Sequence, residues 1–192
     1  MFESIKSVRA VMVGITVATA FGLTQYSGNS ATLQSTEEVD QSRVPHSVEA
    51  EHSAIQNELL SLTLRQSAVG KAARNLASLL EPHFEREEQI ALPPLTLLQP
   101  LATRSVVVQQ ARMVALSDSL RAELPRMLQE HKKIAAAVSR LERAALDARD
   151  DRAIAFAYRL QLHALNEEEI MYPAAILVAE IVRGRAVASE QR

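Results

Sequence analysis

The sequence HFEREEQIALP at residues 83–93 returns as HALNEEEIMYP at residues 163–173, and this repeat decides the fold. A histidine, two adjacent glutamates, an isoleucine and a proline coincide in the two copies at an offset of 80 residues. Leu80 and Leu160 precede the two histidines by the spacing of neighbours on one helical face. Chance rarely places such unlike residues in register twice, so we interpret the chain as a duplicated helical unit.

A second pair of helices carries a matching repeat. Glu51 and His52 correspond to Glu130 and His131, and each histidine begins an apolar stripe with steps of three, four and three. That spacing is typical of one buried helical face. The stripes are Ile55, Leu59 and Leu62 in the first copy and Ile134, Val138 and Leu141 in the second. We therefore predict an all-α protein, an up-down-up-down four-helix bundle, with helices near 46–67, 71–92, 125–148 and 151–172.

Turn and helix-end residues agree with these limits. Gly70 is expected to mark the first hairpin turn, and the acidic cluster in residues 147–151 the second. Pro125 suits the first turn of the third helix. Pro82 lies inside the second helix and predicts a kink or a late helix start. Residues 95–124 link the two halves, and their apolar part, VVVQQARMVAL, predicts an additional helix.

The composition narrows the chemistry. The chain has 192 residues, of which 47% are hydrophobic, enough for one domain with a real core. A net charge of −2 with mixed signs offers no basic surface for nucleic acid. The absence of cysteine excludes thiol catalysis, thiolate zinc sites and disulfides. Any metal must therefore be held by imidazole and carboxylate, which suit iron, manganese, copper or zinc.

The N-terminal stretch differs from the rest of the chain. Lys6 and Arg9 precede a short apolar run at residues 10–23, and a polar stretch follows. This order is typical of a secretory signal or a short anchor, because a full membrane span needs about 20 apolar residues. We expect export or a membrane tether through residues 10–23; the alternative is a loosely packed helix of a cytoplasmic protein. The predicted divisions are a signal peptide or anchor at 1–30, a polar linker at 31–44, the bundle at 45–185 and a tail at 186–192.

The repeated histidines and glutamates are expected to meet inside the bundle. Residues four apart on a helix lie about 40° apart around its axis, so each HxxxE pair projects to one side, the apolar one. Buried carboxylates are costly without a compensating charge, which metal cations supply. We therefore predict a metal site, with hydrogen-bonded core histidines as the alternative. The inward residues are His52, His83, Glu87, His131, His163 and Glu167. His46 lies off this face and is expected at the surface or as a helix cap.

Several neighbours are candidates to support the inward residues. Glu88 and Glu168 each follow an inward glutamate and are expected to orient a ligand or relay a proton. Glu51 and Glu130 are candidates to accept from imidazole N–H groups. Tyr172 is expected to pack in the core, with a hydrogen bond to a bound ligand as the alternative.

The segments EHSAI, HFEREEQIALP, EHKKI and HALNEEEIMYP resemble the hemerythrin-like (HHE cation-binding) domain family across most of residues 45–175. The resemblance implies two iron ions, or other divalent metals, bridged by both glutamates and by an oxo or hydroxo group. It names the six inward residues as the ligands. Proteins of this family bind or sense oxygen, handle nitric oxide or peroxide, or help repair iron–sulfur clusters.

The chain departs from the oxygen-carrying hemerythrins in two places. Ala135 stands where those carry a further histidine on the third helix, and His163 with Glu167 forms HxxxE where those end in HxxxxD. Four histidines would divide two and two, so both metals would keep an exchangeable position, as a catalytic metal needs. This difference favours reaction with oxygen, peroxide or nitric oxide over reversible oxygen carriage.

The predicted function is that of a non-haem di-iron protein that binds or reacts with a small ligand, O2, NO or H2O2, at a four-histidine, two-glutamate site. A di-iron oxidoreductase is one form of this prediction. The alternatives are a metal-binding sensor or iron-handling module without turnover, and a metal-free helical interaction bundle. The sequence assigns no catalytic residue and no oligomeric state.

Overall fold

The computed structural model describes residues 44–191, apart from Val106 and Val108. The predicted signal or anchor at residues 1–30 and nearly all of the linker at 31–44 lie outside the described residues. Among the helices of the described part, none is both long enough and apolar enough to cross a membrane.

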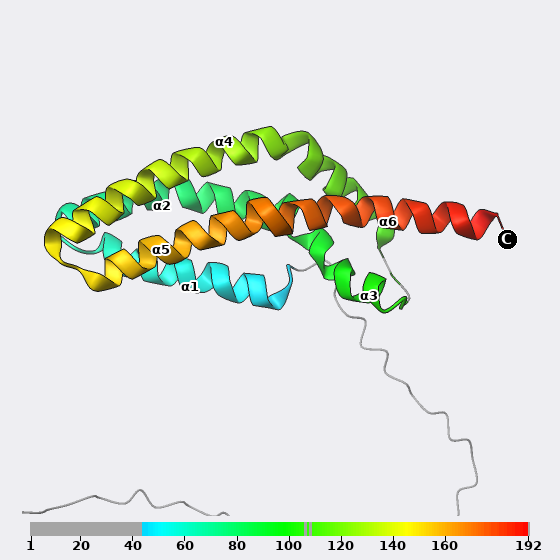
Figure 1. Ribbon diagram of the computed structural model, residues 1–192, viewed down its shortest axis with the longest axis horizontal. Coiled ribbons are helices and arrows are strands. Elements are labelled where there is room, and N and C mark those ends of the chain that lie inside the picture. The colour runs from blue at the N-terminus through cyan, green and yellow to red at the C-terminus, as the bar shows by residue number, and fades with distance from the viewer. Residues whose placement is uncertain (1–43, 106, 108, 192) are drawn as a thin grey trace, which may run out of the picture. The chain divides into compact units, whose positions relative to one another are not determined.

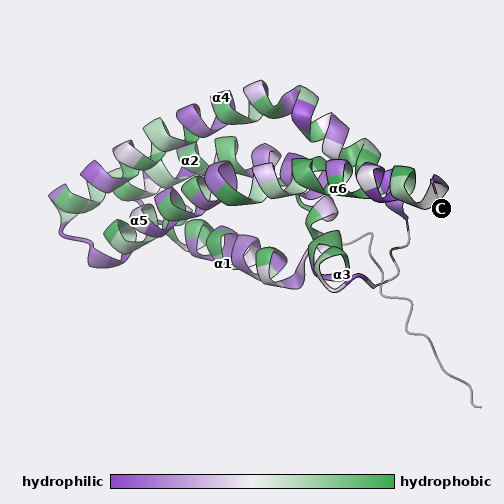
Figure 2. Cartoon of the chain, turned by 45° about the vertical axis from the view of Figure 1, so that its right-hand side comes forward, coloured by the Kyte–Doolittle hydropathy of each residue, from purple (hydrophilic) through white to green (hydrophobic). Residues whose placement is uncertain are grey.

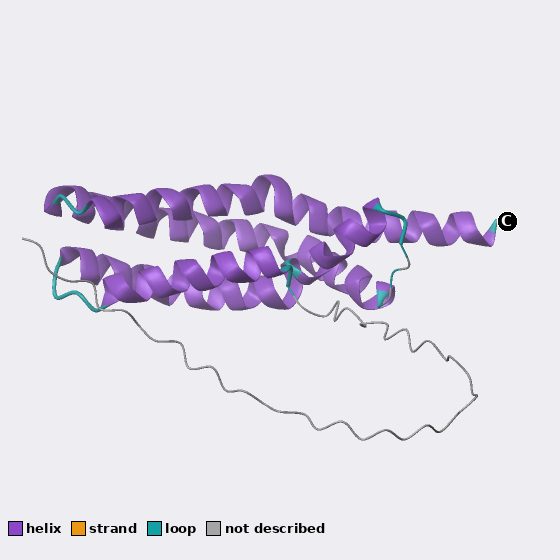
Figure 3. Ribbon diagram, turned by 90° about the horizontal axis from the view of Figure 1, so that it is seen from below, coloured by secondary structure: helices purple, strands orange, loops and turns teal. Residues whose placement is uncertain are grey.

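Four long helices lie side by side and form a bundle (Figure 1). They are α1 (His46–Thr63), α2 (Ala68–Arg86), α4 (Gln110–Ala148) and α5 (Asp151–Asn166). Helix α2 packs against both α1 and α4, and α4 packs against α5. The described residues contain no strand, and short loops join the helices (Figure 3). The all-α prediction is confirmed.

Shorter elements and one further helix complete the described chain. Each of α2 and α5 continues into a π-helical segment, η1 (Glu87–Ala91) and η3 (Glu167–Met171) respectively. A 3-10 helix, η2 (Pro93–Leu97), and a short helix, α3 (Leu98–Ala102), follow η1. Helix α6 (Tyr172–Glu190) follows η3 and packs along the first part of α4.

The third helix of the bundle is longer than its pattern predicts. Helix α4 begins at Gln110 instead of near residue 125, so the predicted linker helix and the third bundle helix are one element. Pro125 lies inside α4, not in its first turn. A proline inside a helix removes one backbone hydrogen bond and bends the helix, and Figure 1 shows that α4 is bent. Helix α2 likewise runs through Pro82, so it does not begin late there.

The two hairpin turns meet at one end of the bundle. Ser67 caps α2 by accepting from the backbone N–H of Gly70, and Asp150 caps α5 by accepting from Ala153. A Cβ atom at Gly70 would lie 1.9 Å from the carbonyl oxygen of Arg65, so only glycine fits where the turn crosses the start of α2. Arg65 also forms an ion pair with Asp150, which ties the first turn to the second.

Apolar and polar residues alternate around the helices (Figure 2), and the apolar faces form two clusters inside the bundle. The larger cluster, which includes Leu62, Leu76, Leu141 and Phe156, lies towards the hairpin turns. The second, which includes Leu92, Leu120, Met127 and Tyr172, lies towards the other end. Along each of the four helices, the predicted site residues fall between members of these clusters. The apolar layers therefore leave one polar layer between them.

Candidate metal centre

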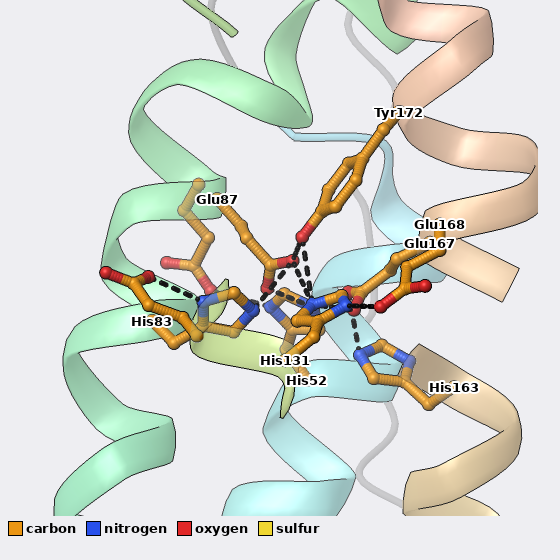
Figure 4. A network of polar contacts seen from close by, with 10 residues as sticks. His52, His83, Glu87, His131, His163, Glu167, Glu168 and Tyr172 are labelled. Atoms are coloured by element: carbon orange, nitrogen blue, oxygen red, sulfur yellow. Dashed lines mark hydrogen bonds and ion pairs between the residues drawn. The ribbon is translucent and has the colours of Figure 1, made fainter. Parts of the chain in front are cut away.

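The polar layer consists of the six residues that the sequence predicts to face inward (Figure 4). All six side chains are 4% exposed or less, namely those of His52, His83, Glu87, His131, His163 and Glu167. Helices α1, α2, α4 and α5 supply one histidine each, and the π-helical segments η1 and η3 begin with the two glutamates. His46, by contrast, is exposed and lies 3.9 Å from Glu49, away from this layer.

The layer divides into two histidine pairs that share the carboxylates. Nε2 of His83 lies 3.4 Å from Oε1 of Glu87, and Nε2 of His131 lies 3.4 Å from Oε2 of Glu167. On the other side, Oε1 of Glu167 lies 2.9 Å from Nε2 of His163 and 3.4 Å from that of His52. Oε2 of Glu87 lies 3.8 Å from Nε2 of His52. Each carboxylate thus presents one oxygen atom to each histidine pair.

The spacing of these atoms makes two groups that are able to hold a metal ion. One group contains His83, Glu87, His131 and Glu167, and the other contains His52, His163 and Glu167. Within each group the donor atoms all lie within 4.8 Å of one another. Glu167 belongs to both groups, so its carboxylate lies between the two positions.

Each imidazole also has a second carboxylate on its outer side. The Nδ1 atoms lie 3.2 Å from Glu88 for His52, 3.0 Å from Glu130 for His83, 2.7 Å from Glu168 for His131 and 3.2 Å from Glu51 for His163. A carboxylate beside Nδ1 favours the proton on that atom, which leaves the Nε2 lone pair pointing inward. The four outer glutamates therefore orient all four imidazoles towards the centre of the layer.

These outer contacts follow the repeat of the sequence. Glu88 and Glu168, at equivalent positions, each face the histidine of their own half. Glu51 and Glu130, also equivalent, each face a histidine of the other half. The structure thus places all four glutamates within 3.2 Å of an imidazole Nδ1 atom. Glu169, the residue after Glu168, is exposed.

Burial and neighbouring charges shift the pKa values of the layer in opposite directions. Burial lowers the pKa of His131, but hydrogen bonds to Glu167 and Glu87 outweigh it and raise the pKa to about 10. Burial raises the pKa of Glu167, yet the neighbouring imidazoles of His131, His163 and His52 bring it well below its usual range. The buried carboxylate of Glu167 is therefore ionised and favours positive charge beside it.

Several polar side-chain atoms in this layer lack hydrogen-bond partners within the described part of the chain. They are Nε2 of His83, both ring nitrogens of His163 and Oε2 of Glu87. Unpaired polar atoms are costly in a protein interior. A cation between the carboxylates and the Nε2 atoms would satisfy the inward-facing atoms, so the donor set fits a metal ion held by nitrogen and oxygen.

Tyr172 reaches the layer from the start of α6. Its hydroxyl donates a hydrogen bond to Oε1 of Glu87 and lies 3.1 Å from Nε2 of His131. Burial, followed by the charges of Glu87 and Glu167, raises the pKa of the phenol. The sequence-based expectation of core packing is thus incomplete, because the ring is buried but its hydroxyl belongs to the polar layer.

The π-helical segments explain how the hydroxyl of Tyr172 comes to face the layer. Five residues of α-helix turn about 140° past a full circle, which would carry residue 172 away from residue 167. In η3 the backbone N–H of Tyr172 bonds to the carbonyl of Glu167, an i to i+5 bond that brings the two residues back to one face. Leu92 bonds to Glu87 in the same way, at 2.9 Å. In the sequence, the sign that both π-helical segments share is the equal spacing from the glutamate to the following proline, Glu87 to Pro93 and Glu167 to Pro173.

One aromatic contact distinguishes the two halves. Phe84 stacks on His52, with ring centroids 3.9 Å apart and planes 5° apart. The equivalent residue beside His131 is Ala164, and there a hollow of about 260 Å³ opens between α4 and α5. Ala135, where oxygen-carrying hemerythrins have histidine, lines the same hollow.

The fold and this layer define a helical protein with a buried histidine and glutamate cluster able to bind metal. The family model described as the hemerythrin HHE cation binding domain matches residues 43–175, which is more than half of the chain. The chain therefore belongs to the hemerythrin HHE family. Comparisons with curated proteins and with solved structures found no match.

Proposed function

We propose that this protein is a non-haem di-iron protein that binds or reacts with a small diatomic or peroxide ligand at its four-histidine, two-glutamate layer. The observation that carries the proposal is the sharing of two carboxylates between two histidine pairs. Each of Glu87 and Glu167 turns one oxygen towards each pair. A carboxylate placed in this way suits a bridge between two ions.

The donor set supports iron as the metal. It contains only imidazole nitrogen and carboxylate oxygen, a combination that suits iron, and it contains no thiolate. In a bundle interior, iron supplies reversible binding or redox chemistry with oxygen, nitric oxide or peroxide. Other divalent metals use the same donors, so iron is the part of the proposal that metal analysis must test.

The protein's own residues would determine how the centre is held and what reaches it. The outer glutamates hold the four rings with Nε2 inward, and the apolar clusters on both sides of the layer exclude water. One group offers two histidines and two carboxylates and the other two histidines and one carboxylate, so either ion would keep unfilled coordination positions. The short connections at residues 64–67 and 149–150 support the up-down-up-down course of this family.

The unfilled positions favour reaction over oxygen carriage. Ala135 supplies no further imidazole, so no fifth histidine would fill a coordination position of either ion. The alternative is a sensor or iron-handling module that binds its ligand without turnover. Decay of added peroxide by the iron-loaded chain, compared with a stable and reversible adduct of oxygen or nitric oxide, separates the two.

Metal content is the test of the proposal. The whole chain is loaded with iron(II) under nitrogen, separated from free metal and analysed for iron per chain. We expect about two irons, because the layer offers two groups of donors. His83→Ala removes one donor from the buried layer and should lose iron, whereas His46→Ala, at an exposed histidine, should keep the wild-type content.

A folded helical chain that takes up no iron would contradict the proposal. The six inward residues would then be core residues of an interaction bundle. Equal loss of iron in the His83→Ala and His46→Ala variants would also contradict it, because the two histidines differ completely in burial.

A further inference from the structure

The two halves of the polar layer differ at one buried position. Leu92 and Tyr172 are equivalent, since each stands five residues after a glutamate of the layer and directly before a proline. Both side chains are buried, at 0% and 1% exposure. Tyr172 alone of this pair brings a polar atom to the layer.

The hydroxyl of Tyr172 touches two donor atoms of a single group. It donates a hydrogen bond to Oε1 of Glu87 and lies 3.1 Å from Nε2 of His131. Both atoms belong to the group that also contains His83 and Glu167. The phenol oxygen is therefore placed beside one metal position and not beside the other.

The distances match those between ligand atoms of one ion. Two donor atoms at about 2.1 Å from an ion, and at right angles to each other, lie about 3 Å apart. The hydroxyl of Tyr172 is 3.1 Å from Nε2 of His131, closer than Oε2 of Glu167 at 3.4 Å. Relative to His131, the phenol oxygen thus has the spacing of a second ligand of the same ion.

We propose that Tyr172 is a seventh ligand residue, whose phenolate oxygen binds the ion held by His83 and His131. This inference rests on the proposed function. Coordination forms a metal–oxygen bond and breaks the phenol O–H bond, and the proton leaves to the solvent without any change in oxidation state. The ion held by His52 and His163 has Leu92 in the equivalent place, so it keeps more open positions for an incoming ligand.

Spectroscopy of the iron(III) form tests this assignment directly. The whole chain is loaded with iron(II), oxidised by oxygen, and examined by visible absorption and resonance Raman spectroscopy. A phenolate bound to iron(III) produces a visible charge-transfer band and enhanced ring vibrations. We expect both in the wild-type chain and their complete loss in Tyr172→Phe. Tyr158→Phe is the matched control and should retain them, because Tyr158 is 61% exposed on α5.

Iron content measured on the same samples separates this inference from the proposed function. Tyr172→Phe should still hold about two irons, since all four histidines and both glutamates remain. Two irons in the wild-type chain without a phenolate band would overturn the inference and leave the proposed function standing. A band that persists in Tyr172→Phe would overturn it equally. No iron uptake by the wild-type chain would contradict both.

Discussion

The two halves of the repeat each contribute three equivalent inward residues to the layer but surround them differently. In the first half, Phe84 covers His52, and Leu92 is buried in the second apolar cluster. In the second half, Ala164 leaves a hollow beside His131, and Tyr172 brings a hydroxyl to Glu87. The comparison indicates that the two halves contribute equivalent donor residues, whereas the hollow and the tyrosine hydroxyl occur in the second half only.

The largest expected effect tests the aromatic difference. Phe84→Ala should lower the free energy of unfolding of the metal-free chain by about 3–5 kcal/mol, because it removes a fully buried ring. Ala164→Phe should change it by about 1 kcal/mol or less, since the hollow beside His131 has room for a ring. Urea denaturation followed by circular dichroism measures both. An equally large loss in Ala164→Phe would show that the hollow is not open to a side chain.

The outer glutamates give an intermediate effect. Glu168→Gln should weaken metal affinity about 10- to 100-fold, because it removes the carboxylate charge 2.7 Å from Nδ1 of His131. Glu88→Gln should cost less, as its carboxylate lies 3.2 Å from His52 and the stacked Phe84 also holds that ring. Competition with a chelator measures both affinities. Glu169→Gln is the exposed control and should match the wild-type chain; a loss equal to that of Glu168→Gln would point to surface charge instead of ring orientation.

The smallest effect concerns the two hairpin turns. Ser67→Ala removes the N-terminal cap of α2 and should lower the free energy of unfolding by about 1 kcal/mol. Asp150→Ala should cost somewhat more, because Asp150 both caps α5 and pairs with Arg65. The double variant Arg65→Ala with Asp150→Ala distinguishes cap from ion pair. If Arg65→Ala alone has no effect, the difference between the turns arises from the caps.

The periodicity of the sequence was enough to predict the bundle and to group its inward residues. A histidine and a glutamate four residues apart on an apolar helical face are carried into the interior with that face, as the burial of His163 and Glu167 illustrates. The predicted length of α4 is wrong because Pro125 suits a helix start, whereas α4 begins at Gln110 and continues through this proline. The prediction for Tyr172 is incomplete because α-helical spacing does not anticipate the π-turn that brings its hydroxyl to the layer.

The π-turn in η3 also determines how the rest of the chain meets the bundle. Helix α6 follows it without a break and buries Ala175, Val178 and Val182 against the first part of α4 and its neighbours. Loss of one residue from η3 would restore regular helix and rotate everything beyond it by about 100°. The apolar face of α6 would then turn towards solvent at the same moment as Tyr172 left the layer. The one extra residue in η3 thus fixes both the position of Tyr172 in the layer and the face that α6 turns to the bundle. A change in this segment would alter the two together.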